Sequence, residues 1–268
     1  MTSEKPAKAN EVLLTALVAN GAGEIFELDG YAAAGMADSQ LSVLTLDQTR
    51  RLPYGSELMY LPDRKPVLLN IRTGKFETLQ DNPYRPGEVI FPVAAFNSPG
   101  YVITLISAYR ETNNAQSLPL FSSGAVGWHK KGVRSAVVLV DSEPRQDLRH
   151  MPRENVIAGV DRMRKRMPDN RLRAHLDKCA LTYGCPAGKN FFLGRYEAPL
   201  PTSKQCNARC LGCLSLQQNS GIHHSQDRIA FTPSPAEIAE VALAHIKRVD
   251  KSVCLLYTSD AADDQWRV

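Results

Sequence analysis

Hydrophobic and polar residues alternate in short segments through the first half of the chain, which is the pattern that β-strands produce. Turn-forming pairs such as Asp29-Gly30 and Pro86-Gly87 separate these segments. The expected strands cover residues 11–19, 40–46, 57–61, 66–71, 88–95, 101–107 and a β-branched run at 133–140. This spacing predicts a β-rich N-terminal domain, a small sheet or barrel, over residues 11–141.

The pattern changes to a helical period after residue 152. Apolar residues recur on one helix face over residues 152–167, and a second helix is expected over 170–180. Residues 191–196 are predicted to form a strand that leads into the next segment. We therefore interpret residues 152–198 as a helical connector. It contains two cysteines, Cys179 and Cys185.

A third helix is predicted to begin after Ser234. Ser234 suits the N-cap, Pro235 suits the first helical position, and Glu237 completes a capping box. From Ile238 to Val249 the apolar residues then fall on one face, as in an amphipathic helix.

Composition and charge narrow the class of protein. The chain has 268 residues, of which 43% are hydrophobic, enough to bury a core in one or two domains. Its net charge of +4 is diffuse, with no basic run interleaved with aromatics, so no nucleic-acid partner is evident. No stretch of about eighteen apolar residues is present, and residues 1–10 lack an apolar core, which predicts neither a membrane span nor a signal peptide.

Three of the six cysteines lie close together, at Cys206, Cys210 and Cys213, in the string C-N-A-R-C-L-G-C. Thiols at this x3 and x2 spacing can converge on one metal centre when a short loop wraps around it. A four-iron cluster is commonly saturated by four thiolates, so three would leave one iron open to a substrate or cofactor. Clustered cysteines of this kind suit a reducing cytoplasm rather than a disulfide framework.

The C-x3-C-x2-C motif, with an extended segment at 200–203 before it and Asn207 after its first cysteine, resembles the radical S-adenosylmethionine (radical SAM) superfamily. The resemblance implies a [4Fe-4S] cluster on Cys206, Cys210 and Cys213. In that family the open iron chelates S-adenosylmethionine, and an electron from the cluster cleaves the sulfonium to give a 5′-deoxyadenosyl radical. Gly212 stands where the family usually has an aromatic residue near the adenine.

The resemblance also implies an architecture and partners. We expect an α+β fold, in which the β-rich N-terminal domain and the helices precede the first β-loop-α unit of an incomplete radical SAM (β/α) barrel at residues 199–253. The resemblance covers only residues 200–253. It implies a cytoplasmic, oxygen-sensitive enzyme that receives electrons from a reductant such as flavodoxin or ferredoxin. We expect the full-length parent to be active and this chain to be inactive.

Two other kinds of site remain open for the cysteines. Three thiolates with His223 or His224 would make a closed Cys3His zinc site in a binding module. A non-catalytic iron–sulfur electron carrier would take Cys179 or Cys185 as its fourth ligand. These two cysteines could instead hold an auxiliary cluster, or be small buried hydrophobic residues.

Residues 254–268 resemble one reading frame of a transposase sequencing adapter. The sequence therefore predicts that this string is an artefact, that the natural chain is truncated near Val253, and that the string takes no part in the fold. Without its three aspartates and one arginine the chain carries a net charge of +6.

Overall fold

The computed structural model describes residues 12–38, 40–118, 123–130, 132–145, 147–206, 208, 210, 213–216, 224 and 226–257. Within it the chain divides into two compact units, residues 1–141 and 142–268. No helix in this described part is long and apolar enough to cross a membrane.

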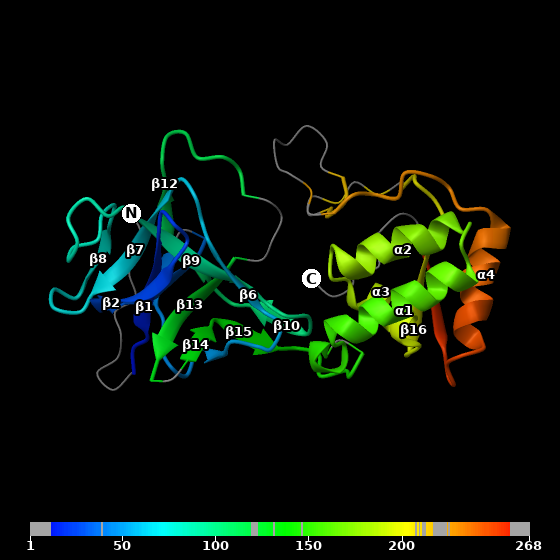
Figure 1. Cartoon of the computed structure of the whole chain (residues 1–268). Helices are drawn as coiled ribbons and strands as arrows, with labels where there is room; N and C mark the ends of the chain where they lie inside the picture. Colours follow the sequence, from blue (N-terminus) through cyan, green and yellow to red (C-terminus); the bar gives the residue numbers. More distant parts are fainter. Residues whose placement is uncertain are drawn as a thin grey trace. The chain divides into compact units, whose positions relative to one another are not determined.

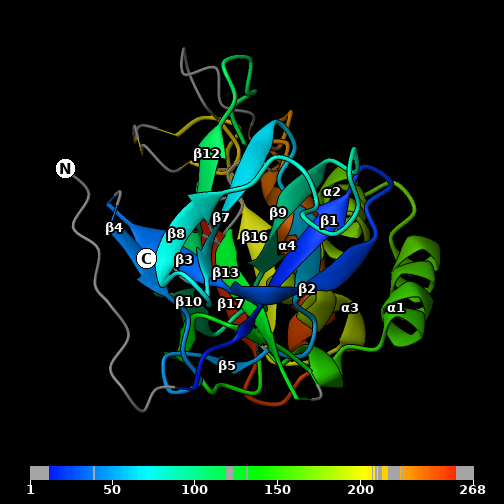
Figure 2. The ribbon, with the colours of Figure 1, turned by 90° about the vertical axis from the view of Figure 1, so that its left-hand side faces the viewer.

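The first unit is built from antiparallel strands that curl into a half-barrel (Figures 1 and 2). The main path of its sheet runs in the order β12-β7-β2-β1-β9-β13-β11-β3-β4. Off this path, β6 pairs with β9, β8 pairs with β7, and β14 pairs with β13 and β5. Strand β10 pairs with β15 in a separate ribbon. The strands are β1 (Thr15–Asn20), β2 (Ile25–Ala32), β3 (Ala34–Ala37), β4 (Gln40–Val43), β5 (Arg50–Arg51), β6 (Glu57–Tyr60), β7 (Arg64–Asn70), β8 (Lys75–Thr78), β9 (Ile90–Phe96), β10 (Tyr101–Ile103), β11 (Ile106–Ser107), β12 (Tyr109–Glu111), β13 (Gly124–His129), β14 (Gly132–Ser135) and β15 (Val137–Leu139).

Small residues are buried on both faces of this sheet. A Cβ atom added at Gly127 would lie 2.7 Å from the Cβ of Leu14 and 2.8 Å from the Cβ of Ala33, so only glycine fits there. Several alanines are fully buried where strands approach closely: Ala16, Ala19, Ala94, Ala95 and Ala125. These side chains allow the strands to come together at the density of a protein interior while larger residues fill the remaining space.

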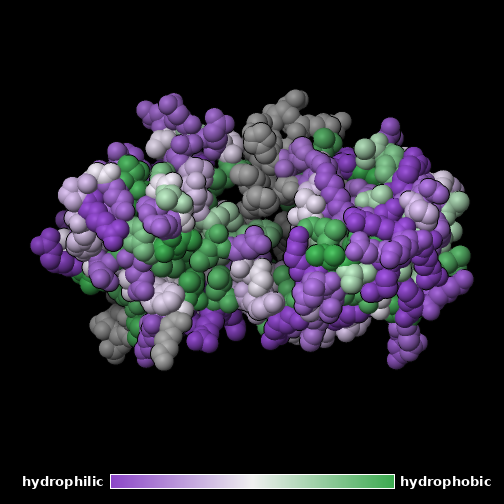
Figure 3. Space-filling model, viewed as in Figure 1, coloured by the Kyte–Doolittle hydropathy of each residue, from purple (hydrophilic) through white to green (hydrophobic). Residues whose placement is uncertain are grey.

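The second unit packs helices around a short parallel strand pair. Its elements are a 3₁₀ turn (Leu148–His150), α1 (Arg153–Arg166), α2 (Arg171–Leu181), α3 (Pro186–Leu193), β16 (Glu197–Pro201), α4 (Pro235–Ile246) and β17 (Val253–Tyr257). All five residues of β16 are buried, and they pair in register with the five residues of β17. Phe191 and Phe192 of α3 have no exposed surface and join the core with residues from every helix of the unit. Hydrophilic residues prevail over the outward side of α1 (Figure 3).

The predicted fold class is wrong. The structure is mostly β, with a curled antiparallel half-barrel sheet of nine strands, four helices in the described residues and 21% helical content. Among those residues β16 pairs with β17 alone, which does not fit the start of a radical SAM (β/α) barrel. A strand followed by a capped amphipathic helix gives the same local pattern in any βαβ segment. Closure of a barrel depends on pairing between distant strands, which the hydrophobic period of a single segment cannot predict.

The strand predicted at residues 191–196 is also wrong. Its first three residues end α3, and Gly194 closes that helix in the left-handed conformation with φ of 69°. Adjacent aromatic residues favour a strand by propensity, but Pro186 at the helix start and the burial of both rings in the core favour the helix.

The structure also differs from the sequence analysis at the C-terminal string. Residues 253–257 form β17, so four residues of the adapter-like segment contribute to the second unit. Cys254 packs against the core cluster of that unit. Residues 258–268 lie outside the described part of the chain.

Candidate functional site

The three clustered cysteines lie in the loop at residues 202–233, here named the cysteine loop, which connects β16 to α4. The backbone N–H and the hydroxyl of Thr202 both donate to the carbonyl of Tyr257, at 2.8 and 2.9 Å. The loop therefore leaves at the carboxyl edge of the parallel pair β16–β17. Open α/β sheets bind their ligands at this kind of edge.

The cysteines differ in exposure. Cys206 and Cys213 are half-buried, whereas Cys210 is exposed. The backbone N–H of Ala208 donates to the Sγ of Cys206 at 3.4 Å. The N–H of Cys213 donates to the carbonyl of Cys210 at 3.3 Å, which closes a tight turn between the two cysteines at x2 spacing.

Arg228 brings a cation to Cys213. Its Nη2 donates to the Cys213 Sγ at 3.6 Å, and its Nε donates to the Ser215 hydroxyl at 3.3 Å. That hydroxyl lies 3.8 Å from the same sulfur. Hydrogen bonds to a ligand sulfur tune the centre that it holds.

The last part of the cysteine loop is fixed to the carboxyl end of α2. Lys178 forms an ion pair with Asp227, whose backbone N–H donates to the Tyr183 hydroxyl at 3.0 Å. His224 Nε2 lies 3.4 Å from the other carboxylate oxygen of Asp227. The hydrogen bond from Lys178 is the main cause that lowers the pKa of Asp227 to about 2, and the same contact raises the pKa of Lys178.

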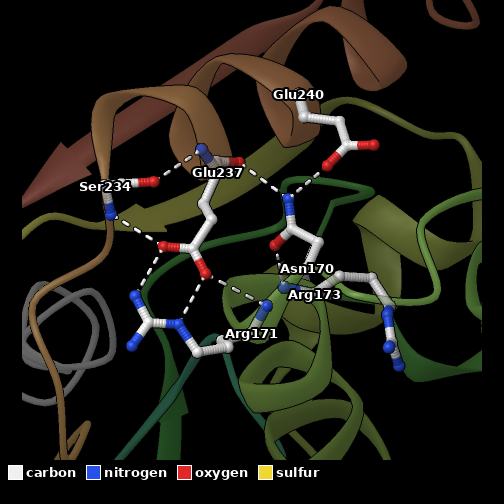
Figure 4. A network of polar contacts seen from close by, with 6 residues as sticks. All are labelled: Asn170, Arg171, Arg173, Ser234, Glu237 and Glu240. Atoms are coloured by element: carbon white, nitrogen blue, oxygen red, sulfur yellow. Dashed lines mark hydrogen bonds and ion pairs between the residues drawn. The ribbon is translucent and has the colours of Figure 1, made fainter.

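A second set of polar contacts fixes the loop to the amino end of α2 (Figure 4). Ser234 and Glu237 form the expected capping box, with bonds of 3.2 and 2.8 Å, so that prediction is confirmed. The guanidinium of Arg171 donates two hydrogen bonds to the Glu237 carboxylate, at 2.7 and 2.9 Å. Hydrogen bonding from Arg171 is the largest cause that lowers the pKa of Glu237 to about 2.

Asn170 adds three hydrogen bonds to this second set of contacts. Its side-chain oxygen accepts from the Arg173 N–H as the N-cap of α2. Its amide nitrogen donates to the Glu237 carbonyl at 3.0 Å and to the Glu240 carboxylate at 2.8 Å. The segment from Asp227 to Ser234 therefore runs antiparallel along α2 and is held at both ends (Figure 1).

The connector cysteines, Cys179 and Cys185, lie near the carboxyl end of α2, next to the Lys178–Asp227 ion pair. Cys179 Sγ is 3.5 Å from His175 Nε2, and the N–H of Cys185 donates to the Cys179 carbonyl at 3.0 Å. Cys185 is buried and starts α3, whereas Cys179 is half-buried. Cys179 directly follows Lys178, so the structure brings this part of the connector to the base of the cysteine loop.

The donor set fits a three-thiolate centre in its chemistry. The thiols are accessible or half-buried, and Cys206 and Cys213 each receive a hydrogen bond at sulfur. In the part of the chain that the structure describes, no three Cys, His, Asp or Glu side chains gather closely enough to hold a metal ion. The three sulfurs therefore do not form a ready-made metal-binding group among the described residues.

One possible zinc ligand, His223, and two residues of the motif, Asn207 and Gly212, fall outside the described residues. Sequence reasoning missed Arg228 and the Lys178–Asp227 pair. These residues lie 15 and 49 positions from their partners, so no local period signals them. A cation next to an aspartate in a polar loop was the only sign of them in the sequence.

Comparison with family models, with curated proteins and with solved structures finds no match to this chain.

Proposed function

We propose that this chain binds a [4Fe-4S] cluster through Cys206, Cys210 and Cys213 and belongs to a radical SAM enzyme. The observation that carries the proposal is the C-x3-C-x2-C triplet in a loop at the carboxyl edge of a parallel strand pair. The proposal rests on this loop and does not include a (β/α) barrel.

Each residue of the site has a role in this proposal. The three thiolates would hold the cluster and leave one of its irons open for the amino and carboxylate groups of S-adenosylmethionine. Arg228 donates to the Cys213 sulfur and offsets negative charge there. When bound, the cluster supplies the electron that cleaves the sulfonium of S-adenosylmethionine. A flavodoxin or ferredoxin is the class of partner that would supply that electron.

The contacts with α2 hold the last part of the cysteine loop in place. Asp227 is tied to Lys178 and Tyr183, and Ser234 is tied to Glu237. Residues 227–234 are already held in the metal-free chain, so their ordering adds no conformational entropy cost to metal binding.

The test is anaerobic reconstitution of the chain with iron and sulfide, followed by counting both elements. The wild-type chain is expected to hold roughly four irons and to show iron–sulfur absorption in the visible range. Cys206→Ala, Cys210→Ala and Cys213→Ala should each lose the colour. Cys254→Ala is the matched control, because that cysteine lies in β17 outside the loop. A triple variant that keeps its iron and colour would contradict the proposal, and so would uptake of one zinc with no iron.

The connector cysteines are expected to be structural. Cys185 is buried at the start of α3, and Cys179 lies beside His175 within α2. The double variant Cys179→Ala with Cys185→Ala should therefore keep roughly four irons. A loss of iron in that variant would assign one of the two as a fourth ligand and favour an electron carrier.

A further inference from the structure

The first unit has a groove on the surface formed by β5, β14 and the turns next to them. Its volume is about 770 Å³, within the range of ligand sites. Three arginines, Arg50, Arg51 and Arg134, line it. The remaining lining residues include hydroxyl and apolar side chains: Ser42, Thr49, Thr104, Leu105, Val137 and Val138.

Arg134 is held rigidly at the base of the groove. Its Nε donates to the Thr49 hydroxyl at 3.0 Å, and its Nη2 donates to the carbonyls of Leu46 and Thr49 at 3.1 and 2.5 Å. In the described part of the chain no acceptor bonds to its Nη1. This nitrogen is the part of a pre-positioned guanidinium that can donate to a ligand.

A second arginine stands directly opposite. Arg51 on β5 and Arg134 on β14 are partners in the antiparallel register, and Arg50 is opposite Ser135. Like charges directly across a sheet repel each other and destabilise the pairing. Burial of Arg134 and, after it, the nearby Arg51 cation lower the pKa of Arg134.

No carboxylate neutralises this pair within the described residues. None of the ion pairs in that part of the chain includes Arg50, Arg51 or Arg134. Asp47 is the one acidic residue among the described lining residues, and its carboxylate accepts from the Thr45 hydroxyl. Among the described lining residues, three arginines therefore stand against one aspartate, an arrangement that an anionic ligand would stabilise.

The chemistry of the lining favours phosphate over carboxylate. A single arginine fork satisfies a carboxylate, whereas a phosphate group has three outer oxygens and a double negative charge that can use several guanidinium groups. Val137 is buried, and Val138 is 43% exposed at the groove. These side chains, with Leu105, offer an apolar wall for the organic part of the ligand.

We propose that this groove binds a small organic phosphate, with Arg51, Arg134 and Arg50 on the phosphate group and Leu105, Val137 and Val138 against the apolar part. This site is independent of the cysteine loop.

The experiment titrates the full chain, without a cluster, with phenyl phosphate by calorimetry at pH 7.5 and near-physiological salt. Phenol has the ring without the charge, and benzoate replaces the phosphate by a carboxylate. Inorganic phosphate has the charge without the apolar ring. Phenyl phosphate should bind most tightly, because only it has both the dianion and the ring.

Arg51→Gln and Arg50→Gln are the test variants, since both side chains are exposed and their loss should not prevent folding. Each should weaken phenyl phosphate binding by about tenfold or more, as expected for a lost charge-assisted bond. Arg51→Gln should also raise the melting temperature of the ligand-free chain, because it removes the repulsion. Arg110→Gln, an exposed strand arginine outside the groove, is the matched control and should bind like wild type.

Three results would overturn the proposal. They are no binding of phenyl phosphate to the wild-type chain at millimolar concentration, equal binding of benzoate, and an equal loss of affinity in Arg110→Gln and Arg51→Gln.

Discussion

Arg228 donates from its Nη2 to the Sγ of Cys213 at 3.6 Å, across a gap of fifteen residues in the sequence. The residue before it, Asp227, is bound to Lys178 on α2. The cysteine loop is therefore linked through two adjacent residues to the helical core of the second unit. This link connects the candidate ligands to a rigid support.

Replacing Arg228 tests whether its contact supports the cluster. Arg228→Gln removes the cation beside Cys213 and should raise the rate of iron loss to a chelator by about tenfold, the lower range for residues that support metal ligands. Arg228→Lys should recover part of this loss because it keeps the charge. Arg162→Gln, on the exposed face of α1, serves as the control. Equal iron retention in all four proteins would show that the contact has no role.

Glu237 gives a pH-dependent contribution to stability. Its pKa is lowered from 4.5 to about 2, so the carboxylate stabilises the fold above pH 4.5 and loses this effect as the pH falls toward 2. Glu237→Gln should lower the free energy of unfolding by about 1 kcal/mol at pH 7, the usual value of an N-terminal cap. The difference from wild type should shrink between pH 4.5 and 2 in urea titrations. A difference that stays constant over that range would contradict the assignment.

The strand β17 should stabilise the second unit. A chain ending at Val253 would expose the buried strand β16, remove the packing of Cys254 and break the two bonds from Thr202 to Tyr257. We expect a loss of about 2 kcal/mol in a denaturant titration, from lost burial and backbone bonds. A chain ending at Tyr257 is the matched control. A loss below about 0.5 kcal/mol, typical of surface changes, would favour the adapter interpretation of this segment.

Gly159 marks a close contact between α1 and α3. A Cβ atom added there would lie 2.4 Å from the Phe192 carbonyl oxygen, which is backbone and cannot move aside. Gly159→Ala should therefore destabilise the chain by about 1–3 kcal/mol, although alanine normally favours a helix. Gly188→Ala in α3 is the control, since its nearest atom would be at 3.4 Å, and it should be neutral or stabilising. Thermal unfolding of the two variants tests the contrast.

Local signals allowed some elements to be predicted and left others hidden. The capping box at Ser234 and the period of α1 depend on neighbours in sequence, and both helices form where the pattern indicated. Helix α3 was missed because its aromatic residues favour a strand, and only their burial in the core selects a helix. The fold class was missed because the pairing of the β-strands depends on contacts between distant segments.

The candidate site shows the same division. The spacing of Cys206, Cys210 and Cys213 is legible in the sequence, because metal ligands in one loop must be close along the chain. The contact of Arg228 with Cys213 and the Lys178–Asp227 ion pair cannot be recognised in the sequence, because folding brings together residues that are far apart along the chain.

In the proposed site, three thiolates would leave one iron open to S-adenosylmethionine. The most direct measurement is the electron paramagnetic resonance spectrum of the reconstituted, reduced chain before and after addition of S-adenosylmethionine. We expect a reduced cluster signal that changes shape when S-adenosylmethionine is added, and no such signal in Cys206→Ala. A cluster signal that is identical with and without S-adenosylmethionine would contradict the proposed open iron.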